Sequence, residues 1–478
     1  MEIKNKNYRW KICGLLFFAT AINYLDRQVL SLTWSDFIAP EFHWTNNDYG
    51  NITALFSIFY AVSLLFAGRF VDWMDTKKGF LWAIGIWSVG ACLHAFCGIA
   101  TSGIITGNWF VGFEEAKEII GTVNDTAMVI NVSVTLFIFV RFVLALGEAG
   151  NFPAAIKATA EYFPKKDRAL STSIFNAGAT VGALAAPISI PFIARAFGWE
   201  MAFIIIGALG FVWMGFWVFM YEKPEKHPKV TAAELAYIQQ DDIAESKLEG
   251  YVPESTAKIS LKQCFKYRQT WAFAFGKFMT DGVWWFFLFW TPAYLSSVYK
   301  MDSTQAALPL FVLYMITLLS IIGGWLPTYF VEKKGMEPYA GRMRSMLIFA
   351  FFPLLALIAQ PLGHFTYWIP VIIIGIAGAA HQAWSANIFT TVGDMFPKKA
   401  IATIVGIGGL AGGIGSTIIN KGSGMLFDYS KETNMLFMGF KGIEAGYFII
   451  FSICAVCYLI GWTVMKLLVP KYSPIKDL

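Results

Sequence analysis

The stretch EYFPKK at residues 161–166 recurs in the second half of the chain as DMFPKK at residues 394–399. A second match lies upstream of each copy, because residues 68–79 and 324–335 both begin with glycine and end with Lys-Lys-Gly. The two matches occur in the same order, which argues against chance. Repeats in the same orientation are typical of transporters built from two related bundles, with the binding site between them. The sequence therefore predicts a fold with two similar halves.

Apolar residues dominate the rest of the chain. Of 478 residues, 56% are hydrophobic and only 14% are charged, compared with about 25% charged in ordinary soluble proteins. The mean hydropathy is +0.55. A helix of about twenty apolar residues is long enough to cross a membrane. We expect an all-α membrane protein with twelve spans, at residues 10–32, 50–71, 80–100, 129–153, 169–194, 200–221, 270–297, 305–330, 343–362, 367–393, 401–426 and 445–469.

The charges of the loops predict the orientation of the spans. The segments 33–48 and 101–128 are acidic, whereas the lysine pairs of the repeats fall in the alternate loops. Basic loops remain on the cytoplasmic side, so we expect both termini there. The first apolar run holds Asp26 and Arg27 and has no convincing cleavage site. We therefore interpret it as a retained span and not as a signal peptide. No role follows for the unusually long segment 101–128.

A polar segment separates the first six spans from the last six. We predict a first half at residues 1–221, a cytoplasmic linker at 222–268 and a second half at 269–478. Within the linker, Thr231–Glu249 has the pattern of an amphipathic helix. It opens with a capping box, in which glutamate follows threonine after three residues.

Several classes of function find no support in the sequence. The basic residues lie in short loops, where they set orientation and form no nucleic-acid-binding surface. The six cysteines lie mostly within predicted spans. Cys454 and Cys457 form a CxxC motif without partner ligands, so no metal site or disulfide framework is indicated. No GK[ST] motif follows a strand, so no ATPase is indicated. We expect no metal and no cofactor, with a proton as the coupling ion.

Ionisable residues inside the predicted spans are the main indication of function, because each costs about 2.5–3.5 kcal/mol on insertion scales. In the first span, Asn23 and Arg27 share a helix face, and Asp26 lies beside them. In the fourth span, Arg141 and Glu148 are seven residues apart and also share a face. If these faces meet, two arginines and two carboxylates converge inside the membrane.

The charges of such a cluster predict coupling between a proton and an anion. The cluster is neutral with both acids ionised, and it becomes positive when either acid is protonated. A carboxylate ligand then balances the charge, held by the planar fork of an arginine. A carboxyl group that loses its arginine to the ligand binds a proton more readily. The alternative is a fixed ion-pair network that holds the two spans together, and an arginine can serve both roles.

Two further spans carry polar and aromatic residues that could contact a ligand. The seventh span holds Lys277 and Asp281, a local ion pair or a second coupling group, followed by Trp284 and Trp285, which could form a stacking wall or face lipid. The tenth span holds a polar cluster that could bind sugar hydroxyls or join helices, namely His381, Gln382, Trp384, Ser385 and Asn387. Further candidates for substrate contact are Tyr24, Tyr60, Asn176 and Asn420.

Several segments resemble motifs of the major facilitator superfamily. GRFVD at 68–72 and KKG at 77–79 are similar to its signature between the second and third spans. Within that superfamily, the chain resembles the anion:cation symporter family, which includes bacterial hexuronate and galactonate carriers, sialin and the vesicular glutamate transporters. The segments that carry this likeness are NYLDR at 23–27, Arg141 with GEAGNFP at 147–153, and EYFP at 161–164. Those most similar to the hexuronate branch are GKFMTD at 276–281, WWFFLFW at 284–290 and HQAWSAN at 381–387.

The resemblance implies alternating access by two rocking halves and proton-coupled uptake of a sugar acid. By motif position, it implies that Asp26 and Glu148 take protons. It further implies that Arg27 grips the substrate carboxylate, whereas Arg141 pairs with an acid. On this basis we expect a monomeric importer of hexuronates, such as glucuronate or galacturonate, embedded in the lipid bilayer of a bacterial inner membrane.

The same resemblance implies a gating loop that contains Gly68, Asp72, Lys77 and Lys78. The chain departs from the family pattern at Gly282, where the hexuronate branch has proline.

Other functions stay open at this point. One is a symporter or exchanger of another organic anion, such as the aldonate galactonate, and another is an exporter of the same fold. A membrane enzyme using His381 and Glu148 would need a nucleophile or metal-ligand spacing, which the sequence lacks. A sensor would bind the anion without moving it.

Overall fold

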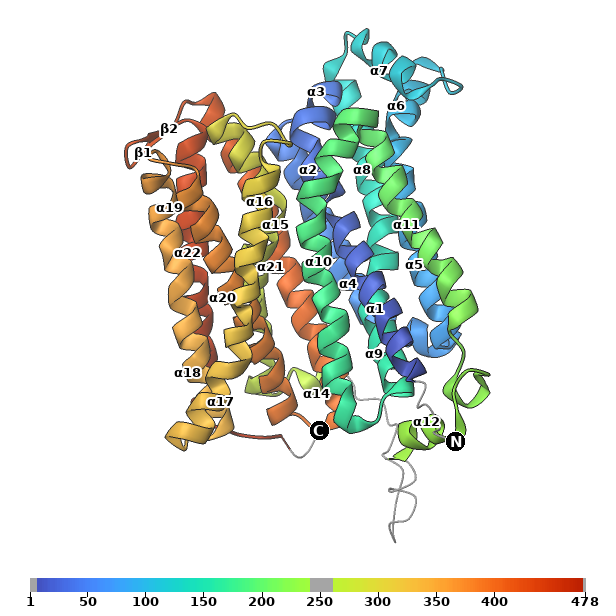
Figure 1. Ribbon diagram of the computed structural model, residues 1–478. Helices are drawn as coiled ribbons and strands as arrows, with labels where there is room; N and C mark the ends of the chain where they lie inside the picture. Colours follow the sequence, from blue (N-terminus) through green and yellow to red (C-terminus); the bar gives the residue numbers. More distant parts are fainter. Residues whose placement is uncertain (1–6, 241–260, 476–478) are drawn as a thin grey trace.

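The computed structural model describes residues 7–240 and 261–475, which form a bundle of long helices (Figure 1). Within these residues, nine helices are long and apolar enough to cross a membrane, and ten if one bent pair counts as a single span. Helices α1 (Tyr8–Arg27) and α15 (Arg268–Tyr299) are also long enough, but they carry charged residues of the predicted site. With these two, the fold has the twelve spans that the sequence predicts.

The spans of the first half are interrupted where charged residues lie. Span α1 ends at Arg27, and α8 ends at Glu148. Interrupted helices are typical of substrate sites in transporters. The elements are α1 with α2 (Val29–Thr33), the π-helix η1 (Trp34–Ile38) and α3 (Ala39–Phe42); α4 (Asn46–Met74); α5 (Thr76–Ala95) with α6 (Cys97–Thr106) and α7 (Phe113–Gly121); α8 (Thr126–Glu148) with α9 (Asn151–Tyr162); α10 (Lys165–Phe197); and α11 (Trp199–Met220).

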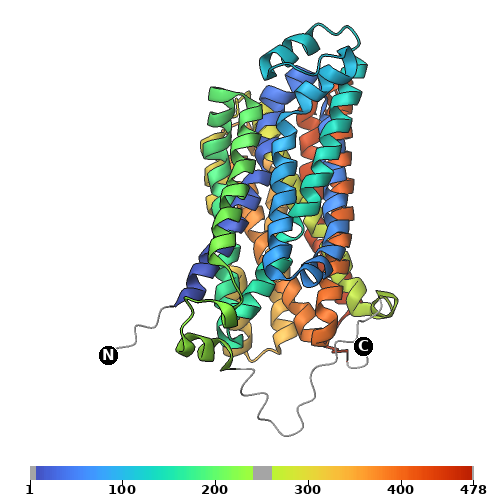
Figure 2. The same cartoon turned by 90° about the vertical axis from the view of Figure 1, so that its right-hand side faces the viewer.

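The long segment between the third and fourth spans is largely helical. Helix α6 bends by 55° away from α5, and α7 follows it. Figure 2 shows these helices as a cap on one end of the bundle. We call this end the α7 end, and we call the opposite end the α12 end, after a short helix in the connection between the halves.

That connection contains η2 (Pro224–Lys226), α12 (Ala232–Ile238) and α14 (Leu261–Cys264). Of the predicted linker helix, the described part is α12, which is capped by the Thr231 hydroxyl accepting the Glu234 amide at 3.2 Å. The Glu234 carboxylate accepts a hydrogen bond from the backbone of Arg9 at 3.0 Å. The glutamate of the predicted capping box therefore ties α12 to the start of α1. Residues 241–249 of the predicted helix lie outside the described part.

The second half repeats the arrangement of long helices. Its elements are α15; α16 (Ala307–Thr317), η3 (Leu318–Ile321) and α17 (Ile322–Lys334); α18 (Pro338–Phe351), η4 (Phe352–Leu355) and α19 (Ala356–Gly363); α20 (Trp368–Met395); α21 (Lys398–Glu432); a hairpin of β1 (Leu436–Phe437) and β2 (Phe440–Lys441); and α22 (Ile443–Leu468).

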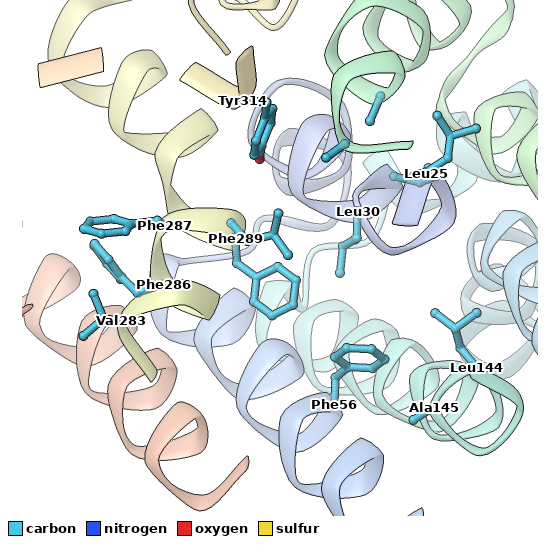
Figure 3. Close-up of a cluster of buried hydrophobic side chains, with 14 of the residues drawn as sticks. Leu25, Leu30, Phe56, Leu144, Ala145, Val283, Phe286, Phe287, Phe289 and Tyr314 are labelled. Carbon is cyan, nitrogen blue, oxygen red and sulfur yellow. The ribbon is translucent and has the colours of Figure 1, made fainter. Parts of the chain in front are cut away.

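The two halves lie side by side, with α4 against α21 and α10 against α16 (Figure 1). Glycine allows the close approach of α4 and α21, because a Cβ atom at Gly50 would lie 3.1 Å from the Cα of Gly424. Buried apolar side chains from both halves meet in one cluster (Figure 3). There the rings of Phe56 and Phe289 lie 6.2 Å apart, centroid to centroid.

Polar bonds between the halves are concentrated toward the α7 end. The Asp428 carboxylate accepts hydrogen bonds from the backbone amides of Asn46 and Asn47 at 3.0 and 2.6 Å. The Asp36 carboxylate accepts one from the Ser303 amide at 2.5 Å. Among the bonds in which both partners are described, every one that joins the halves lies in this part of the bundle. The bonds between the halves that the described residues form therefore lie toward the α7 end.

Candidate binding site

An ion pair between α1 and α8 lies at the centre of the candidate site. The Nε and Nη2 atoms of Arg27 donate to Oε2 of Glu148 at 3.0 and 2.7 Å. The two side chains are only 4% and 0% exposed. The predicted meeting of the first and fourth spans is thus present, at the residue where each helix is interrupted. Burying two charges carries a desolvation penalty that only good geometry offsets, so this pair is either a functional or a structural device.

Three aromatic rings lie close to the Arg27 guanidinium. The centroids of Tyr24, Tyr60 and Trp285 lie 5.2, 4.6 and 5.1 Å from its central carbon. We call these three rings the Arg27 cage. Because Trp285 belongs to α15, the cage contains residues from both halves. Cation–π contacts of this kind are attractive, and more so where water is excluded. The cage therefore places Arg27 at the interface between the halves.

Two polar side chains of α1 lie beside the ion pair without partners. Asp26 and Asn23 are each 1% exposed. Among the described residues, no hydrogen bond reaches either carboxylate oxygen of Asp26 or either amide atom of Asn23. Asp26 interacts electrostatically with Glu148, Arg141 and Arg27. Buried polar groups without partners are rare in native proteins and call for a ligand, a proton or a conformational role.

Arg141 differs from what the family resemblance implies. It is 3% exposed, and none of the described acids lies within ion-pair distance of it. Its guanidinium lies 5.2 Å from the centroid of Phe56, and Nη1 has no hydrogen-bond partner among the described residues. Glu148 pairs with Arg27 instead. Sequence spacing places Arg141 and Glu148 on one face of α8, but it cannot show which arginine the acid selects.

The second half contributes an ion pair within α15. The Lys277 Nζ atom lies 2.8 Å from Oδ2 of Asp281, and the side chains are 7% and 12% exposed. One helical turn further, the ring of Trp284 stacks on His381 of α20 at 5.2 Å with an interplanar angle of 2°. The His381 Nδ1 atom lies 2.7 Å from the hydroxyl of Tyr458. Sequence reasoning missed Tyr458, since a single tyrosine in an apolar span gives no signal.

Of the remaining residues predicted to contact the ligand, two asparagines are bonded to neighbouring groups of the protein. Asn387 donates to the backbone oxygens of Gly323 and Ala383, both at 2.8 Å, and Asn420 accepts from the Trp290 indole at 2.9 Å. These two asparagines thus join or brace helices of the second half, as the alternative reading of the tenth span anticipates for Asn387. Gln382 and Ser385 are half-buried, Trp384 is buried and Asn176 is exposed.

Comparison with known proteins identifies the family. The model of the Major Facilitator Superfamily matches residues 16–419. The chain belongs to the major facilitator superfamily. The superfamily fold is evident in solved structures too: a structure titled D-xylose-proton symporter superposes with a TM-score of 0.66 at 15% identity, covering 98% of each chain.

Curated relatives within the superfamily are named as sugar-acid transporters. The chain is 28% identical to the "Hexuronate transporter" of Escherichia coli K12, over 97% of this chain and 95% of the relative. It is 26% identical to the "Galacturonate transporter" of Dickeya chrysanthemi, over 68% and 84%. It is 24% identical to the "Probable galactarate/D-glucarate transporter GarP" of Escherichia coli K12, over 95% of each.

The superfamily signature lies at the α12 end. Its predicted gating residues are Gly68 and Asp72 in α4 and Lys77 and Lys78 in α5; of Asp72, the side chain lies outside the described part. Lys77 binds Glu222 at 2.9 Å, and this hydrogen bond lowers the pKa of Glu222. Asp75 binds Lys223 at 3.2 Å. Both ion pairs fasten the α4–α5 turn to the start of the linker after α11, and neither reaches the second half.

Proposed function

We propose that this member of the major facilitator superfamily imports sugar acids together with protons by alternating access. The single observation that carries the proposal is the buried cluster at the interface, in which Arg27 is bound to Glu148 while Arg141 has no acid partner among the described residues. Two cations and two acids in this arrangement can exchange an internal carboxylate for one supplied by a ligand. The sugar-acid transport named for several relatives supports the same class of substrate.

Arg141 is the first position proposed for the ligand carboxylate. A guanidinium without a counter-ion in a buried site attracts an anion strongly, since water does not screen its charge. Asp26, which accepts no hydrogen bond, is the first acid proposed to take a proton, because a neutral carboxyl group leaves Arg141 uncompensated. The site then carries one positive charge, which the ligand neutralises.

Glu148 is the second proposed protonation site. When Glu148 is neutral, it no longer competes for Arg27, and the guanidinium can turn its fork to the ligand. The ligand carboxylate and the proton therefore bind together and leave together. Asp281 is a further candidate for a proton, since it has the same relation to Lys277.

The body of the sugar acid is proposed to lie between the aromatic residues of the two halves. Trp284 and Trp285 are half-buried neighbours on α15, and flat aromatic faces suit the apolar side of a sugar ring. His381 can hydrogen-bond to a hydroxyl group through Nε2, while its Nδ1 atom is occupied by Tyr458. A hexuronate such as glucuronate or galacturonate fits these groups, because it offers one carboxylate and several hydroxyls.

The proposal of alternating access is supported by the distribution of the described bonds between the halves. The bonds between the halves lie toward the α7 end, so this conformation is proposed to admit the ligand from the α12 end. Because basic loops favour the cytoplasmic side, we propose that this end faces the cytoplasm. Uptake then requires a second conformation, in which the bonds at the α7 end are broken.

Uptake of labelled glucuronate into proteoliposomes with an acidic exterior tests the coupling. The wild-type protein should accumulate glucuronate against its gradient. Glu148→Gln keeps the shape of the side chain but cannot ionise, so it should lose concentrative uptake and retain some exchange of internal for external glucuronate. Accumulation by this variant at the wild-type level contradicts the role of Glu148.

Spectroscopic distances between labels at the α7 end test alternating access. Asp428→Asn weakens three hydrogen bonds to Asn46 and Asn47, so it should increase the population that is open at this end. Asp48→Asn is the matched control, since Asp48 caps the same end of α4 but within its own half. An equal shift in both variants would show that the bonds of Asp428 do not hold the halves together.

A further inference from the structure

One face of α15 brings charged and aromatic groups toward the first half. Counted from Lys277, the next residues of this face are four, seven and eight positions further along: Asp281, Trp284 and Trp285. This spacing places all of them on one side of a helix. The direction of that side is known from Trp285, whose ring covers the Arg27 guanidinium at 5.1 Å. Asp281 also interacts electrostatically with Tyr24 of the Arg27 cage. The ion pair of α15 therefore belongs to the same site as the ion pair of the first half.

The Lys277–Asp281 ion pair does not itself connect two helices. Both residues lie in one turn of one helix, so their 2.8 Å contact joins no two elements. One oxygen of Asp281, Oδ1, is buried without a hydrogen-bond partner among the described residues. Each charge within a span costs about 2.5–3.5 kcal/mol on insertion scales. A pair that does not brace the bundle is retained against this cost, which indicates a role in the site.

The surroundings of the pair leave Lys277 with a single counter-ion. The titratable groups that face it are Tyr24 of α1 and Tyr458 of α22 beside Asp281, and His381 of α20 beside Lys277. No other acid within the described ranges forms an ion pair with Lys277. When a ligand enters, the group that can replace Asp281 must itself be an anion.

The neighbouring helices pack closely against the pair. On one side, Gly412 of α21 lies so close to the Asp281 carboxylate that any larger residue would overlap it. On another side, the Lys277 ammonium lies 4.5 Å from the centroid of Phe389 of α20. An aromatic face stabilises a cation without neutralising it. Lys277 can therefore keep its position while its carboxylate partner changes.

We propose that Lys277 is a second carboxylate-binding position, so that the site accepts sugar acids with a carboxylate at each end of the carbon chain. One carboxylate binds at Arg27 and Arg141 in the first half, and the other displaces Asp281 from Lys277 in the second half. Asp281, whose carboxylate the ligand would replace, and Trp285, whose ring lies 5.1 Å from Arg27, are four residues apart. Four residues correspond to about 6 Å along the helix axis, which is on the scale of a six-carbon chain. This proposal rests on the proposed function of sugar-acid transport.

The far end of the ligand decides whether Lys277 takes part. A hydroxyl or aldehyde group cannot balance the charge of a buried ammonium, so a sugar acid with one carboxylate leaves the Lys277–Asp281 pair closed. A second carboxylate makes a charge-assisted hydrogen bond of the same kind as Asp281 does. A diacid therefore connects the two halves through two ion pairs, and a monoacid connects them through one.

Glucuronate and glucarate provide the matched ligands for a test, because their open-chain forms differ only in the oxidation of one terminal carbon. Equilibrium binding of each is measured on the purified full-length protein at one pH. Both should bind to the wild type. Lys277→Gln should weaken glucarate binding by about tenfold or more relative to its effect on glucuronate binding, as expected for the loss of a hydrogen bond to a charged group.

A double variant keeps the test decisive if Lys277→Gln is unstable. Lys277→Gln with Asp281→Asn leaves the net charge of the site unchanged and leaves no unpaired acid, and it should show the same selective loss of glucarate. Equal weakening of both ligands, or a wild type that binds glucuronate but not glucarate, overturns the second carboxylate position and leaves the proposed function standing. A wild type that binds neither ligand overturns both proposals.

Discussion

Within the described residues, each half of the molecule holds one buried ion pair, and the two pairs differ in what they connect. Arg27 and Glu148 come from α1 and α8, with a shortest contact of 2.7 Å. Lys277 and Asp281 come from a single turn of α15, with a contact of 2.8 Å. The contact distances are thus nearly the same. Only the pair of the first half fixes the relative position of two helices, and only this pair lies where both helices are interrupted.

The difference indicates a division of roles between the halves. An ion pair between two helices can be broken by a small displacement of either helix. Whether it is formed therefore depends on the conformation of the bundle. A pair within one helix travels with that helix and changes only when a ligand or a proton replaces a partner. We therefore assign coupling to conformation to the first half, and recognition of the ligand's far end to the second.

The largest expected effect is on stability when one cation is removed. Arg27→Met leaves Glu148 unpaired with 0% of its side chain exposed, whereas Lys277→Met leaves Asp281 unpaired with 12% of its side chain exposed. Loss of one partner of a buried pair costs about 3–5 kcal/mol, and partial access to water reduces that cost. Thermal unfolding in detergent at neutral pH should therefore show a larger fall in Tm for Arg27→Met. Equal falls in Tm would mean that an unpaired acid costs the same free energy of unfolding at both sites.

A smaller effect is expected when both members of a pair are replaced. Lys277→Met with Asp281→Leu removes the charges of α15 without leaving one uncompensated, and replacing a buried pair by apolar residues is often neutral or stabilising. The Tm of this double variant should recover most of the loss seen in Lys277→Met. If it does not recover, the pair braces the bundle and the distinction between the halves fails.

The geometry of the cation matters more in the first half than in the second. Arg27 uses two nitrogens on Glu148, whereas Lys277 makes a single contact. Arg27→Lys should therefore weaken glucuronate binding by about tenfold, because a lysine cannot present a fork to a carboxylate. The binding constant at fixed pH measures this effect. A wild-type constant in Arg27→Lys would show that the ligand does not use the fork.

The fold and the composition of the site were accessible from the sequence, and the pairing within the site was not. The repeated motifs at 161–166 and 394–399 and the apolar runs predict the two halves of long helices, because these signals are local. The charged residues of the first and fourth spans stand out, since charges in apolar helices are rare. Which arginine binds Glu148 depends on the rotation of α1 against α8, and that rotation is set by packing over the whole interface.

Tertiary packing also explains the residues that sequence reasoning overlooked or overrated. Tyr458 has no local signal, because its role arises only where α22 passes His381. Asn420 stands out as a polar residue in an apolar span, yet its side chain is taken up by Trp290. Polarity within a span therefore predicts that a partner exists, and the structure decides whether that partner is a ligand or a neighbouring helix.

The smallest expected effect compares one tyrosine from each half. Tyr458→Phe removes the hydroxyl that lies 2.7 Å from His381, and a single hydrogen bond contributes about 0.5–1.5 kcal/mol. Glucuronate binding should weaken by up to about tenfold, because the imidazole loses its orientation. Tyr60→Phe keeps the ring that lies 4.6 Å from Arg27, so binding should change less. A larger effect of Tyr60→Phe would show that its hydroxyl contacts the ligand directly, and recognition of the sugar body would then belong to both halves equally.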